Sequence, residues 1–380
     1  MLRTRQIHLV IEEQVKHNIH LARPALTQED IDAAVAVMRS GMLIQGSNVK
    51  ELEAISSKDI GKPVKACSSG TAALHLALLA LEIGQNDEVI VPAFSFVASA
   101  NSIEITGAKA VFVDIDPATF CIDPSQIEAK ITSRTKAIMP VHEFGLCANM
   151  PAIMEIAGKH NLKVVEDAAC AYGASIHGKV SGHWGDLATW SLHPRKIITS
   201  GEGGLVSAQT QALADKVDAL RNHGIVIEEN GMDFHFAGLN YRLTDFQAAM
   251  LLGQLKRLDS TLDTHASIAE RYLVGINNPK IRLPHVPSGQ QHTWQTFHLV
   301  LNSAMDQQET IAKLKEKGIF TNYGAQCIPA MKYYSEKYKH DIRAEFPHAW
   351  EAFTQGLALP IHTFLTDEEI DYIIDQINEL

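Results

Sequence analysis

Short apolar runs alternate with helical patterns along the chain from about residue 60. Runs rich in apolar and β-branched residues at 87–94, 109–116, 135–145, 162–173 and 186–194 are typical of buried strands. The spacing of apolar residues predicts helices at 70–84, 100–107, 122–131 and 150–161, so a helix precedes each strand but the last. This alternation predicts a parallel α/β sheet.

A long helical pattern follows the predicted sheet. Residues 246–276 predict one continuous helix, which leads to a smaller region running from residues 292–301 to residues 367–380. A chain of 380 residues is long for one ordinary core and suggests two domains. We therefore predict an N-terminal extension (1–19), a large domain (20–250), and a linking helix with a small C-terminal domain (251–380).

Composition narrows the classes of function. The formal net charge of −11 argues against nucleic-acid binding, because proteins that bind phosphate backbones usually present a basic face. No apolar run is long enough to cross a membrane, and residues 1–20 lack the apolar core and cleavage site of a signal peptide. The five cysteines form no CxxC pair, so we expect reduced thiols in a cytoplasmic protein.

Residues that follow the predicted strands are the first candidates for a site, because ligands of open α/β sheets bind beyond the carboxyl ends of the strands. These residues are Phe96, Ser99, His142, Asp167 and the segment 191–196. The eighteen histidines show no HExxH or paired-ligand spacing, so we expect no metal site. We expect His193 to pack or hydrogen-bond beside a ligand rather than to act as a general base.

The segment Ser-Ser-Gly-Thr at 68–71 opens the predicted helix at 70–84. Backbone N–H groups and hydroxyls at the positive end of a helix dipole suit a phosphate group. Serine and threonine are also favoured N-cap residues, so capping is the simpler explanation of this segment when it is taken alone.

Asp167 ends a predicted buried strand at the ligand-binding edge. Its carboxylate could hold a cation, a ribose hydroxyl or a protonated ring nitrogen, or could cap the next turn. Its neighbour Glu166 should point to the other face of the sheet, because successive side chains of a strand alternate.

Lys196 lies in the segment SLHPRKIITSGEGGLVSA, residues 191–208. A lysine near glycines can be a solvated surface residue or a phosphate clamp, but neither a Walker loop nor a GxGxxG fingerprint is present. A third possibility is a lysine that forms an imine with a carbonyl group.

A phosphate site, a strand-end aspartate and a lysine after a later strand match the needs of one cofactor. Pyridoxal 5'-phosphate requires an anion site for its phosphate, an acid for its ring nitrogen and a lysine for its aldehyde. The sequence therefore predicts a pyridoxal-phosphate site.

A series of segments in order from about residue 20 to the C-terminus resembles the DegT/DnrJ/EryC1/StrS family of sugar aminotransferases. Among them are SSGTAALHLAL, VIVPAFSFVASANSI, VVEDAACAYGA and SLHPRKIITSGEGGLV. The resemblance implies an α/β fold-type I aminotransferase, with a large, mostly parallel-sheet cofactor domain and a smaller C-terminal α+β domain. It also implies a homodimer with shared active sites that acts on a nucleotide-linked keto sugar.

The resemblance assigns roles to individual positions. Lys196 matches the lysine that binds the cofactor's aldehyde and then moves a proton, and Asp167 matches the partner of the ring nitrogen. Gly70, Thr71 and Ser191 would bind the phosphate, and Phe96 would stack on the ring. Asn240 would reach the phosphate of the cofactor in the neighbouring subunit. Candidate substrate contacts are His193 and, across the interface, Arg242.

Several positions depart from the family pattern. Cys170 stands where the family often has glutamine or histidine in contact with the cofactor's phenolic oxygen, and a thiol is a weak hydrogen-bonding group. Leu192 replaces a common phenylalanine, and Asn149 replaces a common aspartate. Lys196 is retained, whereas the family's sugar 3-dehydratases carry histidine there, and this favours amino transfer over dehydration.

The expected amino donor is glutamate, which would convert the cofactor to pyridoxamine 5'-phosphate. The segment KIITSGEGG favours amination at C4 of the sugar. Two alternatives remain: an aminotransferase for a C3-keto sugar or a keto-cyclitol, and a catalytically quiet pyridoxal-phosphate-binding regulatory protein.

Overall fold

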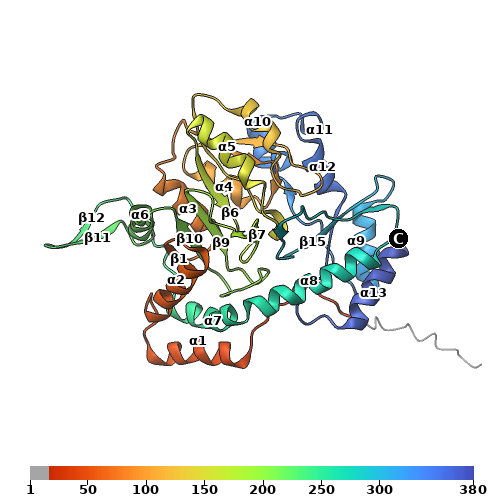
Figure 1. Cartoon of the computed structure of the whole chain (residues 1–380), viewed down its shortest axis with the longest axis horizontal. Coiled ribbons are helices and arrows are strands. Elements are labelled where there is room, and N and C mark those ends of the chain that lie inside the picture. Colours follow the sequence, from red (N-terminus) through yellow and green to blue (C-terminus); the bar gives the residue numbers. More distant parts are fainter. Residues whose placement is uncertain (1–16) are drawn as a thin grey trace, which may run out of the picture.

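The computed structural model describes residues 17–380, and its centre is a seven-stranded sheet (Figure 1). The strand order is β1-β10-β9-β6-β5-β2-β4; the strands from β9 to β4 run parallel, and β10 is antiparallel to both neighbours. The bounds are β1 (Val64–Cys67), β2 (Glu88–Pro92), β4 (Lys109–Val113), β5 (Thr135–Ile138), β6 (Lys163–Asp167), β9 (Leu187–Ser191) and β10 (Gly204–Ala208). The predicted mostly parallel sheet is confirmed.

Helices from both the N-terminal segment and the βα connections pack around this sheet (Figure 1). They are α1 (Gln28–Ser40), α2 (Ser47–Ile60), α3 (Gly70–Ala80), α4 (Ala98–Ile105), α5 (Met150–His160), α6 (Gln211–Arg221) and α7 (Asp245–Lys256). Most side chains of α3 are buried, because this helix packs on β9 and β10 and also on α4 and α6. The apolar character of α3 on nearly every face follows from these contacts.

A second, three-stranded sheet has its own apolar core. It consists of β13 (Ile281–Arg282), β15 (Phe297–Leu301) and β17 (Gly356–Leu359), and its helices are α8 (Leu258–Gly275), α9 (Gln307–Glu316) and α13 (Asp367–Asn378). Ile19 is buried in this core and forms a β-bridge with Ile319. The part of the predicted extension at residues 1–16 lies outside the described residues, and the domain boundaries stay a prediction.

The remaining elements are short. Two small sheets pair β3 (Phe94–Ser95) with β16 (Gln326–Cys327), and β7 (Ser175–Ile176) with β8 (Lys179–Val180) and β14 (Gln290–Gln291). A hairpin of β11 (Ile225–Glu228) and β12 (Gly231–Phe234) extends away from the body (Figure 1). Three helices, α10 (Lys332–Tyr338), α11 (Ile342–Glu345) and α12 (Pro347–Thr354), lie between β16 and β17 in the sequence.

The helix predicted at 122–131 is wrong. The chain there forms two 3₁₀ turns, η1 (Pro124–Gln126) and η2 (Glu128–Lys130), and Ile131 is already extended. Asp123 accepts a hydrogen bond from the backbone N–H of Ser125, which favours a tight turn over an α-helix.

The single long helix predicted at 246–276 is also wrong, because it breaks between α7 and α8 at Arg257 (φ −108°, ψ 9°). The Arg257 guanidinium donates to Asp30 on α1, with Nη2 2.6 Å from Oδ2, and to the carbonyl of Gly253. The break between α7 and α8 therefore occurs where Arg257 contacts α1, a helix more than two hundred residues away in the sequence.

The five cysteines are all free, which agrees with the expected reduced thiols. Their predicted cytoplasmic location stays a prediction. Within residues 17–380, none of the helices combines the length and the apolar character that a membrane crossing requires.

Candidate active site

A cavity of about 370 Å³ opens where β6 and β9 end, beside the first turn of α3. Eight of the predicted site residues line it: Gly70, Thr71, Phe96, Asp167, Cys170, Ser191, His193 and Lys196. The parallel strands bring their carboxyl ends to this edge, so residues far apart in the sequence meet there.

Two glycines let the phosphate candidates come together. A side-chain carbon added at Gly70 would lie 2.7 Å from Cβ of Ser191, and one added at Gly204 would lie 2.4 Å from the carbonyl oxygen of Ser69. Both glycines are therefore required for close packing of β9 and β10 against the start of α3. Ser69 caps α3 by accepting from the N–H of Ala72. The first N–H groups of the helix have no acceptor within the helix and form an anion-binding end beside Ser191.

Asp167 lies at the base of the cavity and is only 3% exposed. Its Oδ2 accepts from the hydroxyl of Ser99 at 2.7 Å, and its Oδ1 accepts from the N–H of Ala169 at 3.1 Å. Burial raises the pKa of Asp167, while the Ser99 hydrogen bond opposes the rise. A cationic ring nitrogen above this carboxyl would favour its ionised form.

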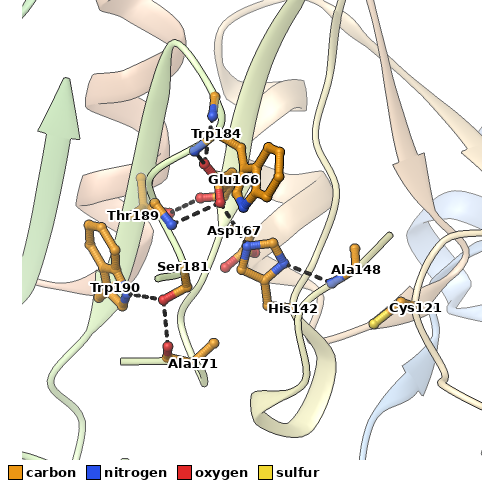
Figure 2. A network of polar contacts seen from close by, with 12 residues as sticks. Cys121, His142, Ala148, Glu166, Asp167, Ala171, Ser181, Trp184, Thr189 and Trp190 are labelled. Carbon is orange, nitrogen blue, oxygen red and sulfur yellow. Dashed lines mark hydrogen bonds and ion pairs between the residues drawn. The ribbon is translucent and has the colours of Figure 1, made fainter. Parts of the chain in front are cut away.

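Glu166 points to the opposite side of the sheet, as strand alternation predicts (Figure 2). Its carboxyl accepts from the backbone N–H groups of Gly182, Trp184 and Gly185 and from Nε2 of His142 at 2.9 Å. Nδ1 of His142 accepts from the N–H of Ala148, so the ring proton is on Nε2. This buried network joins the loop after β5 to the strand that carries Asp167.

Lys196 is half-buried on the loop that follows β9. Its Nζ donates to Sγ of Cys170 at 2.9 Å. The cysteine that departs from the family pattern at this position therefore places its thiol in contact with the candidate lysine. Burial raises the pKa of the Cys170 thiol, while the charge of Lys196 lowers it.

Phe96 and His193 form further parts of the cavity wall. The ring of Phe96 is 62% exposed, which leaves one face free to cover a flat ligand. Nδ1 of His193 accepts from the backbone N–H of Arg195, and burial lowers the pKa of this histidine. His193 therefore forms a local hydrogen bond at the cavity wall, and its role stays a prediction.

Glu143 was missed by the sequence reasoning, which named only its neighbour His142 after this strand. Glu143 lines the cavity and is 5% exposed. Strand periodicity gives no signal for it, because β5 ends at Ile138 and Glu143 begins a 3₁₀ turn, Glu143–Gly145.

Asn240 and Arg242 do not line the cavity of their own chain. Asn240 is exposed, and Nη1 of Arg242 donates to Oδ1 of Asn222 at 2.6 Å. Both residues follow the β11–β12 hairpin in the sequence. No group of metal-ligating side chains among residues 17–380 has the geometry of a metal site.

The model of the DegT/DnrJ/EryC1/StrS aminotransferase family matches residues 24–378. The chain belongs to this family. It is therefore an aminotransferase, and membership confirms the α/β fold of type I that the resemblance implied.

Relatives in the family cover nearly the whole chain. GDP-perosamine synthase of Caulobacter vibrioides is 37% identical over 95% of this chain and 98% of its own. A pleiotropic regulatory protein of Geobacillus stearothermophilus is 39% identical over 90% of this chain and 92% of its own. Among solved structures, Spr1654 from Streptococcus pneumoniae is named as a sugar aminotransferase in its PMP form. It superposes on this chain with a TM-score of 0.90 and is 30% identical in sequence, and the match covers 96% of this chain and 97% of the other. The same protein is also known in a PLP form.

Proposed function

We propose that the protein transfers an amino group from an amino acid, glutamate being the expected donor, to a nucleotide-linked keto sugar with pyridoxal 5'-phosphate as cofactor. The observation that carries this proposal is the convergence of Lys196, Asp167 and the first turn of α3 on one cavity. A single cofactor uses all three features.

The residues of the cavity fit this cofactor. The anion-binding end of α3, with Gly70, Thr71 and Ser191, suits a phosphate group, and the glycine at position 70 leaves the room that the approach requires. Asp167 would hold the proton on the ring nitrogen, and Phe96 would cover the ring. When bound, the cofactor withdraws electrons from the carbon that bears the nitrogen, so that a proton can leave this carbon.

Lys196 would have two roles in turn. Its Nζ would first bind the cofactor's aldehyde carbon and then, once free, take a proton from one carbon and return it to another. Cys170 lies 2.9 Å from Nζ and would orient the amine without competing as a strong base.

We further propose that amination occurs at C4 of the sugar. The relative named GDP-perosamine synthase supports this choice. The test is incubation of the pyridoxamine form with GDP-, UDP- and dTDP-linked 4-keto sugars and with 3-keto sugars, followed by mass spectrometry and NMR of the product. We expect a 4-amino sugar; a product aminated at C3, or an aminated cyclitol, would overturn the assignment.

A regulatory protein without catalysis is the second candidate, because one relative is named as a pleiotropic regulatory protein. The retained Lys196 favours catalysis, since binding alone requires no group that moves a proton. Addition of glutamate to the protein with bound cofactor distinguishes the two candidates. Loss of the visible absorption band supports an aminotransferase, and an unchanged band supports a regulatory protein that binds the cofactor without catalysis.

We also propose a homodimer in which each chain contributes to its partner's site. The β11–β12 hairpin protrudes from the body (Figure 1). Its side chains Ile227, Met232 and Phe234 are 76%, 59% and 60% exposed. Such apolar side chains on a protruding hairpin are typical of an interface. The position of Asn240 outside its own cavity agrees with a role in the partner's site. Light scattering should give twice the mass of one chain; a monomer at micromolar concentration would contradict the dimer.

A further inference from the structure

Glu143 is a buried acid that the proposed chemistry leaves unused. It follows β5, in a segment where Val141 forms a parallel bridge with Asp167 and where the N–H of His142 donates to the carbonyl of Asp167 at 2.9 Å. Its Oε2 is shielded from solvent and has no hydrogen-bond partner among the described residues. A shielded polar atom without a partner is costly, so it is kept only where something else requires it.

The order of the strands indicates what Glu143 faces. Ser191 ends β9, Asp167 ends β6, and Glu143 follows β5, so these residues stand in a row along the edge of the sheet. In pyridoxal phosphate the phosphate arm and the phenolic oxygen lie on opposite sides of the axis from the ring nitrogen to the aldehyde. With the phosphate toward Ser191 and the nitrogen toward Asp167, the phenolic oxygen is on the side of Glu143.

The surroundings of Glu143 keep it in its neutral form. Burial and the nearby charge of Asp167 together raise the pKa of Glu143 to about 8, although the charge of Lys196 and hydrogen bonding from Ser95 and the backbone of Phe144 oppose the rise. Cys170 also faces this region. A neutral carboxylic acid has an O–H donor that a carboxylate lacks.

On the other side of Glu143 is a cavity of about 10 Å³ lined also by His285, His292 and His298. Burial lowers the pKa of both His292 and His298 to about 3. These two rings are therefore neutral near pH 7 and do not stabilise an ionised Glu143.

We propose that Glu143, as a neutral acid, donates a hydrogen bond to the phenolic oxygen of the bound cofactor. This inference rests on the proposed function, because it requires pyridoxal phosphate in the cavity. It makes Glu143 a cofactor-binding residue that controls how tightly the phenolic oxygen holds its negative charge. Cys170 is only a weak donor, so the stronger hydrogen bond to this oxygen is left to Glu143.

The test is a pH titration of the visible absorption band in the wild-type holoenzyme and in the Glu143→Leu and Glu143→Gln variants. Leucine has no donor, whereas glutamine keeps a donor of the same length. Without a donor, the phenolic oxygen attracts the proton on the adjacent cofactor–lysine nitrogen more strongly, so this proton leaves at a higher pH. We expect Glu143→Leu to raise the midpoint by about one pH unit, the tenfold effect that a hydrogen bond to a charged group can supply. Glu143→Gln should remain close to the wild type.

Three outcomes of this titration would overturn the inference: no shift in Glu143→Leu, an equal shift in both variants, or a shift to lower pH. Equal shifts would mean that hydrogen-bond donation is not the cause, because glutamine keeps a donor. A wild-type protein without a visible band would instead contradict the proposed function, so the two failures are distinguishable.

Thermal unfolding of the cofactor-free proteins provides a second measurement. We expect Glu143→Leu to melt at or above the wild-type temperature, because it removes a buried acid with a partnerless oxygen. Because the pKa of Glu143 is raised from 4.5 to about 8, this residue lowers the stability of the folded wild type as the pH rises from 4.5 toward 8. The difference in melting temperature in favour of Glu143→Leu should therefore grow over this pH range. A lower melting temperature for Glu143→Leu at every pH would show a structural role and overturn the inference.

Discussion

Substitution Lys196→Ala should lower the rate of amino transfer by about four orders of magnitude. It removes the single amine that both binds the aldehyde and moves the proton. The cofactor should still bind through its phosphate and ring nitrogen, since those contacts come from α3 and Asp167. The measurement combines product formation with borohydride reduction followed by peptide mapping. In the wild type, borohydride should fix the cofactor on the peptide that contains Lys196.

The matched control for this substitution is Lys163→Ala. Lys163 is an exposed lysine at the start of β6, and its Nζ pairs with Asp186 at 2.9 Å, far from the strand end that carries the site. This variant should keep the wild-type rate and the wild-type labelling. A small primary amine added to Lys196→Ala should restore part of the activity, which a purely structural role would not allow. Unchanged turnover or labelling in Lys196→Ala would refute the assignment.

Substitution Glu166→Ala should reduce the free energy of unfolding by about 4 kcal/mol, because each buried donor left without an acceptor costs about 1 kcal/mol or more. The carboxyl is fully buried and accepts from three backbone N–H groups and from Nε2 of His142 (Figure 2). Alanine would leave all four donors without an acceptor. Denaturant unfolding, monitored by circular dichroism, measures the loss.

The pH dependence provides a further check on Glu166. Although burial raises the pKa of Glu166, the hydrogen bond from His142 together with those from the backbone N–H groups lowers it below the ordinary value. The contribution of Glu166 to stability is therefore present above its unfolded pKa and is lost as the pH falls through its folded pKa. The difference between wild type and Glu166→Ala should shrink in acid. Glu143→Leu, which also removes a buried carboxyl, is the contrast, since it should cost no stability.

Much of the site was predictable because its residues lie directly after strands with clear apolar patterns. Asp167 and Ser191 each end a strand that the sequence predicts, and Ser99 hydrogen-bonds Asp167 from the helix that follows β2 and β3. The break at Arg257 was not predictable, since the helical pattern continues through it and the bond to Asp30 joins distant segments. Glu143 was missed because its sequence marks it only as a polar residue after a strand.

The sequence by itself determined the alternation of helices and parallel strands, the opposite orientations of Glu166 and Asp167, and the family, because periodicity and local motifs are properties of neighbouring residues. Only the tertiary structure decided that Lys196 donates to Cys170, that Glu143 is buried beside Asp167, and that Asn240 lies outside its own cavity. Burial and hydrogen-bond partners depend on segments far apart in the chain, and these properties distinguish a buried neutral acid from a surface carboxylate.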